Sequence, residues 1–297
     1  MACSFPIKGY RTASGKVVFA ELKKHGDQFM YTEVPCGQCA RCRESQAQDW
    51  SLRCMQEAAL HKHNCFVTLT YEDEHLPPRG QLRYKDFQLF IRYLRRYTGR
   101  RIRYFVAGEY GERNNRPHFH ALLFDYDFPD KTPGRLLASG MQLYTSALAS
   151  KCWRNRGFVG IGSVTPASAS YCVGYLFKRR TGAWAEEHYK RVDDSGEYSM
   201  VAEFASMSRK PGIGLDFAVK YAADIFPRGS CEFGGMTVPL PKYYVKKFKE
   251  AAPHMYEEYK ASQEARAEAR SEDNTEERLI VKDAYCKAKR RFKERIL

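Results

Sequence analysis

Two histidines separated by one residue, His118 and His120, are the first feature of the sequence that could do chemistry. In a β-strand, residues two apart point to the same face, so the two imidazoles would lie side by side while Phe119 points the opposite way into a core. Neighbouring imidazoles can bind one metal ion. The pair alone is weak support for a site, because half-exposed strand histidines are ordinary.

A third ligand is expected from the preceding strand. Residues 102–109 and 118–126 have the composition of strands, and the segment between them contains Gly, Asn and Pro, as hairpin loops do. If that loop is centred on residues 113–114, Glu109 lies directly opposite His118 and shares its face. The carboxylate and the two imidazoles would then form a three-ligand site with open positions, as a catalytic metal requires. The alternative is that Glu109 is a solvated strand end.

A pair of tyrosines supplies a candidate nucleophile. Tyr171 and Tyr175 are four residues apart, and Lys178 follows three residues later. In a helix, which Pro166 is expected to open, these three side chains share one face. A tyrosine phenol can attack a phosphodiester and form a covalent phosphotyrosine, which conserves the bond energy for religation, and two tyrosines permit two successive transfers. Lys178 would stabilise charge or orient the metal or the phosphate. The alternative is a helix that packs its tyrosines against a sheet and ends in basic residues favoured by its dipole.

These groups need a sheet to carry the histidines and helices to cover it. Hydrophobic residues at helical spacing predict helices, and short runs of β-branched and aromatic residues predict strands. The expected helices cover residues 44–63, 85–97 and 215–226, and the expected strands beyond the hairpin cover residues 65–71 and 158–164. The order strand, helix, hairpin, strand, helix predicts an α+β fold in which helices cover a sheet. Residues 256–297 are highly charged and predict a long solvated helix or a partly disordered tail.

The size and charge of the chain limit its function. Its 297 residues can form one large domain or a catalytic domain with extensions, and its 43% hydrophobic and 14% aromatic content fits a packed protein. The formal charge of +14, from 49 Lys and Arg against 35 Asp and Glu, favours a nucleic-acid partner. The sequence has no long uncharged apolar run and no signal-peptide pattern after Met1, so we expect no membrane partner and a cytoplasmic location.

Three motifs carry a resemblance to a known family. They are Phe66–Thr70, Arg116–His120 and Tyr171–Lys178, with Gly108–Gly111 placed before the histidines. In this order they resemble the motifs of HUH endonucleases that initiate rolling-circle replication, especially the replication initiators of gokushovirus-type single-stranded DNA bacteriophages. A looser match extends through Ser208–Leu215.

The resemblance implies a central antiparallel sheet flanked by helices, with helical extensions at both ends of the chain. It also implies Mg²⁺ or Mn²⁺ at the three-ligand site, and cleavage of the viral strand of single-stranded DNA at the replication origin. A tyrosine would hold the 5′ end, leave a 3′ hydroxyl as primer and later permit rejoining of the displaced strand. Tyr175 has the Tyr-x-x-Lys spacing to Lys178 and is the expected first nucleophile, with Tyr171 as its partner; the reverse order is the alternative.

Other partners and functions follow from what the sequence lacks. It has no G-x-x-x-x-G-K-[ST] loop of a helicase, so we expect a host helicase and polymerase to act with it in the bacterial cytoplasm. The competing functions are a non-catalytic origin-binding protein, a plasmid- or transposon-type HUH nickase, and an unrelated oxidation with two His and one carboxylate. The expected domains are a Cys-containing N-terminal segment with its helix (1–63), the endonuclease core (64–182) and a mostly helical C-terminal extension with a partly disordered end (183–297).

Cysteines offer a second metal site. Cys36, Cys39 and Cys42 have the spacing of metal ligands, and one more ligand would complete a structural Zn²⁺ site. The candidate fourth ligands are Cys54, His61 and His63. An iron–sulfur cluster has no supporting fourth motif. The alternative is a set of reduced thiols in a loop before a helix.

Arginines interleaved with tyrosines could follow phosphates and stack unpaired bases. The residues expected to contact DNA are Arg95, Arg96, Arg100, Arg101, Arg179 and Arg180. The alternative is a solvated basic face, which is the commoner role of such runs. A second basic stretch, Lys287–Arg295, has less support.

Overall fold

The computed structural model describes most of the chain. The described residues are 3–12, 14–19, 30–111, 114–136, 140, 142–174, 183–269 and 271–296. The chain divides into two units: Asp49–Lys246 form one, and the two chain ends, Met1–Gln48 and Lys247–Leu297, together form the other. We call the first the sheet unit and the second the terminal unit.

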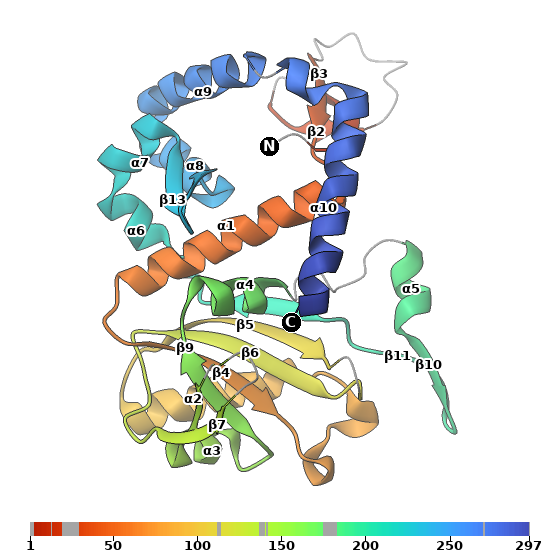
Figure 1. The fold of residues 1–297 in the computed structure, drawn as a ribbon, viewed down its shortest axis with the longest axis vertical. Helices are drawn as coiled ribbons and strands as arrows, with labels where there is room; N and C mark the ends of the chain where they lie inside the picture. The colour runs from red at the N-terminus through yellow and green to blue at the C-terminus, as the bar shows by residue number, and fades with distance from the viewer. Residues whose placement is uncertain are drawn as a thin grey trace. The chain divides into compact units, whose positions relative to one another are not determined.

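The sheet unit is built on seven antiparallel strands in the order β12-β5-β6-β4-β9-β8-β7 (Figure 1). The strands are β4 (Asn64–Thr70), β5 (Arg103–Tyr110), β6 (Pro117–Phe124), β7 (Thr132–Leu136), β8 (Gln142–Thr145), β9 (Val159–Ser163) and β12 (Phe204–Met207). The neighbours β4 and β6 are apolar along most of their length, as strands covered on both faces are. The predicted α+β fold with an antiparallel sheet flanked by helices is confirmed.

One face of the sheet packs against two helices. They are α2 (Tyr84–Thr98) and α3 (Ala147–Trp153). Phe119 of β6 is fully buried in this core, where its ring lies 6.1 Å from that of Phe87 in α2 and 6.0 Å from that of Trp153 in α3. Because side chains alternate along a strand, this contact commits the histidines on either side of Phe119 to the opposite face.

The opposite face is covered by α4 (Pro166–Gly174) and by the second half of α1 (Ala40–Ala59). Trp50 of α1 lies with its ring 5.3 Å from that of Phe105 in β5. Glu57, which is almost fully buried, pairs with Arg103 at 2.5 Å between Oε1 and Nε. These contacts attach α1 to the sheet.

The helix α4 is fixed at its start and in its middle. Thr165 and Ser168 bond reciprocally: the Ser168 backbone N–H donates to the Thr165 hydroxyl at 3.1 Å, and the Thr165 N–H donates to the Ser168 hydroxyl at 2.8 Å. This is a capping box, and Pro166 occupies the first helical turn. Further along, the buried Cys172 thiol donates to the carbonyl oxygen of His120 at 3.1 Å. The helix is therefore tied directly to the histidine strand.

The predicted elements along the sheet unit match the structure, and the later part adds elements that were not predicted. One expected helix over 215–226 is two helices, α6 (Leu215–Lys220) and α7 (Ala222–Arg228), which meet at Tyr221 where the backbone leaves the helical conformation. The remaining elements are η1 (Asp73–His75), η2 (Pro78–Gly80), α5 (Ala183–Tyr189), the hairpin β10 (Lys190–Asp193) with β11 (Gly196–Ser199), and the hairpin β13 (Ser230–Phe233) with β14 (Met236–Pro239). The edge strand β12 pairs with β5, so the sheet continues beyond the predicted core boundary at residue 182.

The terminal unit combines the first strands of the chain with its last helices. Its elements are β1 (Ile7–Arg11), β2 (Val17–Val18) and β3 (Met30–Val34), the start of α1, the end of α8 (Lys242–Ala251), α9 (Pro253–Glu268), η4 (Ser271–Asn274) and α10 (Glu276–Ile296). The N-terminal extension is thus a three-stranded antiparallel sheet as well as a helix. The charged stretch predicted as one helix or tail over 256–297 contains two helices. Among the described residues, no helix has the length and apolar character needed to cross a membrane.

Replacing Phe119 by Ala should destabilise the protein strongly, because the change leaves a cavity between β6, α2 and α3. We expect a loss of about 3–5 kcal/mol in the free energy of unfolding, the usual cost for a buried Phe. Urea unfolding followed by circular dichroism measures it. Phe158→Ala is the matched control, since that ring is 47% exposed, and its loss should be much smaller. Equal losses for the two variants would contradict the assigned core.

Candidate functional site

The hairpin of β5 and β6 brings a carboxylate beside the two histidines. Glu109 pairs with His118 across the two strands, and Tyr110 pairs with Pro117 at the end of the ladder. The loop is closed by the Gly111 N–H, which donates to the Arg116 carbonyl at 2.9 Å. The predicted register is confirmed, and it puts Glu109 on the sheet face that carries the histidines.

Both ring nitrogens of His120 have partners. Its Nε2 lies 3.0 Å from Glu109 Oε1, and its Nδ1 lies 3.1 Å from the hydroxyl of Thr68 on β4. His120 and Glu109 are only 4% and 5% exposed. The Thr68 contact fixes the ring orientation and aims Nε2 at the carboxylate, in the way that outer partners orient metal-binding histidines.

His118 is held by the backbone of its own loop. Its Nδ1 lies 2.5 Å from the Arg116 carbonyl, so Nδ1 carries the proton and Nε2 keeps its lone pair. Its ring is nearly parallel to that of His120, with 6.3 Å between centroids and 7° between planes. Burial lowers the pKa of His118, although the Arg116 carbonyl acts to raise it. A neutral imidazole is the form that binds metal.

The donor set of Glu109, His118 and His120 suits a divalent ion. One carboxylate oxygen and two neutral imidazole nitrogens are ligands for first-row divalent metals such as Mn²⁺, and the carboxylate also suits Mg²⁺. Glu109 and His120 already touch, and His118 stands beside them on the same strand face. Within the part of the chain that the structure describes, however, the group whose ligand atoms all lie within 4.8 Å of one another is a set of cysteines elsewhere.

One of the two candidate tyrosines lies against this site. The ring of Tyr171 in α4 meets the His120 ring edge-on, with 5.1 Å between centroids and 76° between planes, and it makes a similar contact with Phe66 at 6.2 Å. Tyr171 is 44% exposed, so its phenol is open to a ligand, while its neighbours Cys172 and Val173 are buried and anchor the helix. The other predicted site residues of this segment, Tyr175, Lys178, Arg179 and Arg180, lie outside the described residues.

The predicted DNA-binding arginines of α2 and the following loop are not brought to the histidines. Arg95 donates to the Ile102 carbonyl through Nε at 3.1 Å and Nη2 at 2.5 Å, and Arg101 donates to the Lys210 carbonyl at 2.9 Å. Arg96 and Arg100 are exposed. The helix α2 covers the sheet face opposite the histidines, so DNA contacts by these residues would be remote from the site.

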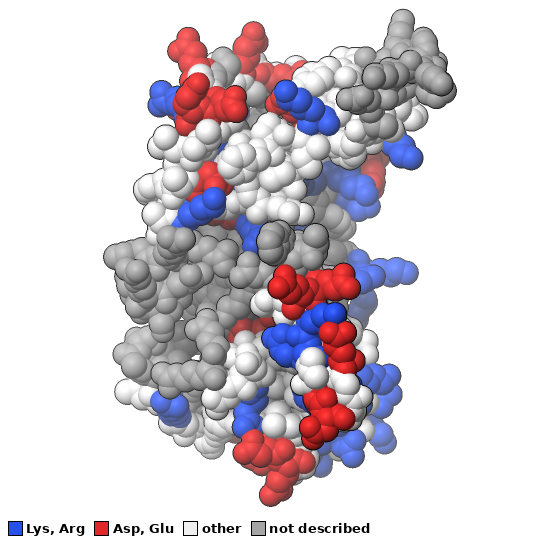
Figure 2. Space-filling view, turned by 90° about the vertical axis from the view of Figure 1, so that its right-hand side faces the viewer, with Lys and Arg blue, Asp and Glu red and all other residues white. Residues whose placement is uncertain are grey.

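Charge is mixed on the face of the molecule shown in Figure 2. Lys and Arg side chains lie beside Asp and Glu there, without a continuous basic track among the described residues of that face. Ion pairs in the sheet unit include Arg79 with Asp193 at 2.7 Å and Lys190 with Glu197 at 2.8 Å. The net positive charge is therefore partly paired locally, and charge alone does not locate the DNA.

Sequence reasoning missed two residues that orient the site. Thr68 belongs to the first motif, and its role follows from the pairing of β4 with β6, in which Thr68 is opposite His120. Arg116 was noted only as part of the histidine motif; its carbonyl holds His118, while its guanidinium donates to the Tyr71 carbonyl at 2.7 Å and pairs with Asp73. The available signal was position: both residues stand within motifs.

The cysteine cluster has a fourth member that was not predicted. Cys3 joins Cys36, Cys39 and Cys42. The predicted fourth ligand, Cys54, is wrong for this cluster, because it lies about 18 Å further along α1 than Cys42 by the rise of a helix. It is fully buried in the sheet unit. His61 lies beyond the end of α1, 3.7 Å from Glu57.

The thiols of the cluster differ in acidity. Burial raises the pKa of Cys42 to about 12, with hydrogen bonds to neighbouring thiols adding to the effect. Burial acts in the same direction on Cys39, but backbone N–H donors from Cys42 and Ser4 outweigh it and lower the pKa of Cys39 to about 6. Four neighbouring thiolates repel one another, so the fully ionised cluster requires a positive charge.

Comparisons with known proteins agree with the motifs. Residues 64–180 match a family model described as that of the replication-associated protein ORF2, and this range contains most of the three motifs and all of their candidate site residues. The chain is 32% identical over 271 residues to the replication-associated protein VP4 of Bdellovibrio phage phiMH2K, covering 88% of this chain and 81% of that protein. This chain belongs to the family of microvirus replication-associated proteins.

Two further members of the family have similar sequences. The replication-associated protein ORF2 of Spiroplasma virus 4 is 30% identical over 271 residues, which cover 84% of this chain and 81% of that protein. The replication-associated protein ORF4 of Chlamydia phage 1 is 24% identical over 219 residues, 71% of this chain and 52% of that protein. No solved structure matches. The resemblance to gokushovirus-type replication initiators is confirmed, and the family acts in phage DNA replication.

The buried environment of His118 should be visible in its titration. Because burial disfavours the charged ring, its midpoint should fall below the ordinary value of 6.5. The unfolded chain then binds a proton that the folded chain does not, so His118 lowers the stability as the pH falls through 6.5 and has no such effect above it. NMR titration of the imidazole C–H signals measures the midpoint, and the His118→Asn variant identifies the resonance. A midpoint at or above 6.5 would refute this environment.

Proposed function

We propose that this protein nicks the viral strand of single-stranded DNA at the replication origin through a phosphotyrosine intermediate and later rejoins the strand. The observation that carries the proposal is the contact between Tyr171 and His120, whose Nε2 touches Glu109. A candidate nucleophile and a candidate metal-binding set therefore share one face of one sheet. Membership in a family of phage replication-associated proteins supplies the DNA context.

Glu109, His118 and His120 are the proposed ligands of Mg²⁺ or Mn²⁺. Such an ion would polarise the scissile phosphate and offset the negative charge that develops on it. The chain's own contribution is orientation: Thr68 holds the His120 ring, and the Arg116 carbonyl holds the His118 ring. Both imidazoles are thus kept neutral and turned before the ion binds.

The tyrosines perform the covalent step. A phenolic oxygen attacks the phosphorus and forms the O–P bond, the bond from phosphorus to the 3′ oxygen breaks, and the phenolic proton is released as the 3′ oxygen takes up a proton. The 5′ phosphate stays on the tyrosine. Rejoining is the reverse attack by a 3′ hydroxyl. We assign the first attack to Tyr175, with Lys178 beside the phosphate, and the second to Tyr171.

The rest of the machinery is proposed on the same basis. The chemistry belongs to residues 64–182, close to the range that the family model matches, and Arg179 and Arg180 would bind the DNA backbone next to the tyrosines. Since the sequence has no helicase loop, strand separation and synthesis are assigned to host helicase and polymerase in the bacterial cytoplasm.

A covalent adduct tests the mechanism. The full chain is incubated with Mn²⁺ and an origin oligonucleotide labelled at its 3′ end, and the products are separated on a denaturing gel. Wild type should give a labelled protein band, which EDTA abolishes. The double variant Tyr171→Phe with Tyr175→Phe should give none, and the two single variants should show which tyrosine acts first. Tyr97→Phe is the matched control, because Tyr97 is an exposed residue of α2 on the other side of the sheet.

Two results would overturn the proposal. One is an adduct that persists in the double variant. The other is wild-type protein that binds the oligonucleotide equally with and without EDTA but never forms an adduct, which would indicate a non-catalytic origin-binding protein instead.

Replacing Thr68 by Val should weaken metal binding without unfolding the protein. Val has nearly the same shape but cannot hold the Nδ1 atom of His120, and loss of such an orienting partner typically lowers metal affinity about 10–100-fold. Electron paramagnetic resonance of free Mn²⁺ during titration measures the affinity. Thr70→Val is the control, since the Thr70 hydroxyl makes no hydrogen bond to the described residues. Equal affinities for both variants would argue against His120 as a ligand.

A further inference from the structure

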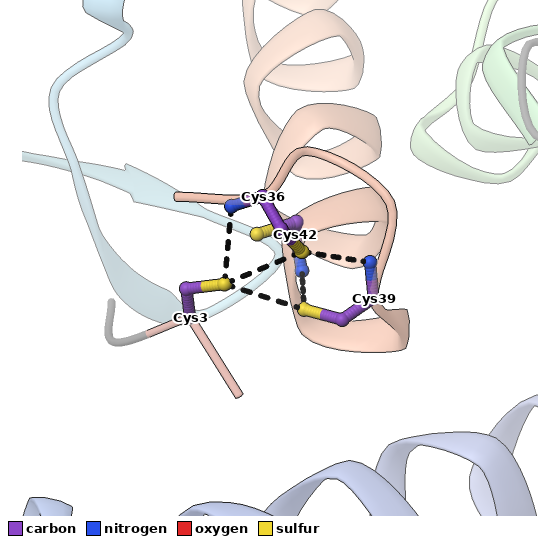
Figure 3. Close-up of side chains that lie close together, drawn as sticks. All are labelled: Cys3, Cys36, Cys39 and Cys42. Carbon is purple, nitrogen blue, oxygen red and sulfur yellow. Dashed lines mark hydrogen bonds between the residues drawn. The ribbon is translucent and has the colours of Figure 1, made fainter. Parts of the chain in front are cut away.

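The four cysteines of the terminal unit converge on one point. Cys3 comes from the start of the chain, Cys36 and Cys39 from the segment before α1, and Cys42 from its first turn (Figure 3). The Cys3 sulfur lies 3.4 Å from that of Cys36 and 3.8 Å from that of Cys39, and all four sulfur atoms lie within 4.8 Å of one another. All four are free thiols.

The spacing suits a single ion. Four sulfurs bound tetrahedrally to Zn²⁺ at about 2.3 Å lie about 3.8 Å from one another. Two separate disulfides would divide the sulfurs into two pairs, whereas here Cys3 approaches two different partners. A cluster of several irons would force the sulfurs further apart than one ion does.

Backbone donors surround the sulfurs. The N–H groups of Cys36, Cys39 and Cys42 donate to the sulfurs of Cys3, Cys36 and Cys39, at 3.3, 3.3 and 3.4 Å respectively. The Gln38 N–H also approaches the Cys36 sulfur at 3.5 Å. Such donors stabilise thiolates, as does the N-terminus of the helix that begins at Ala40. The loop is therefore shaped to present negative sulfur to a cation.

We propose that Cys3, Cys36, Cys39 and Cys42 bind one Zn²⁺ ion in a closed structural site. Four thiolates complete the tetrahedron and leave no open position, which distinguishes this site from a catalytic one. The ion joins the first residues of the chain to the start of α1. It is separate from the histidine site and does not depend on the proposed nicking chemistry.

The site is connected to the C-terminal helix. The Asp283 carboxylate of α10 is 2% exposed and accepts from the Ala40 N–H, at the start of α1, at 3.2 Å. Lys287 pairs with the same carboxylate at 2.8 Å, and the Cys286 thiol donates to Glu44 at 3.0 Å. The ion thus orders the segment on which α10 docks, so zinc binding stabilises both ends of the chain together.

Metal analysis of the full chain tests the site. Wild-type protein purified without chelator should contain one zinc per chain by plasma mass spectrometry. Cys3→Ser should lose most of it. Two cysteines serve as controls that should keep the zinc: Cys286→Ser, a partly exposed thiol of the same unit, and Cys54→Ser, the candidate that the structure excludes.

Cobalt keeps the test decisive if Cys3→Ser folds poorly. Wild-type protein stripped of metal and loaded with Co²⁺ should show the strong visible bands of a tetrahedral thiolate site and the near-ultraviolet bands of sulfur-to-cobalt charge transfer. Hydrogen exchange should slow on loading at the start of α1 and in α10. Iron in place of zinc, a zinc content well below one per chain without thiolate bands, or zinc lost from Cys54→Ser but not from Cys3→Ser would each overturn the proposal.

Discussion

The site depends on one constraint, which is the alternation of side chains along β6. Phe119 is locked between α2 and α3, and a strand cannot turn one residue into the core without turning its neighbours away from it. The two histidines are therefore fixed on the α4 side by hydrophobic packing on the other side. The antiparallel register with β5 and β4 then delivers Glu109 and Thr68 to the same face. Packing energy that has no chemical role of its own determines where the chemistry can occur.

Local patterns were sufficient to predict the sheet and the histidine face. The β5–β6 hairpin could be placed because its loop residues fix the register, and the register alone puts Glu109 opposite His118. The helix α4 could be placed because Pro166 and the residues around it carry a helix-start signal. Each of these features is decided by residues close together in the sequence, where spacing and turn chemistry leave few alternatives.

Long-range pairing was not predictable in the same way. The edge strand β12 is four residues long and joins β5 across about a hundred residues of sequence, which no periodicity reveals. Likewise Cys3 reaches Cys36 from a distant part of the chain, whereas Cys54 had only the advantage of being nearer in sequence. The orienting roles of Thr68 and Arg116 also depend on which atom meets which ring. Proximity in sequence was a good guide within hairpins and a poor one elsewhere.

The composition of the terminal unit has a consequence for biosynthesis. The sheet unit is one continuous stretch, Asp49–Lys246, so it can fold as soon as that stretch has left the ribosome. The terminal unit needs both the first and the last segments of the chain, because Asp283 of α10 meets Ala40 at the start of α1. Its first half must wait, unpaired, until α10 has been synthesised. Translation therefore imposes an order in which the histidine face forms before the two ends of the polypeptide have met.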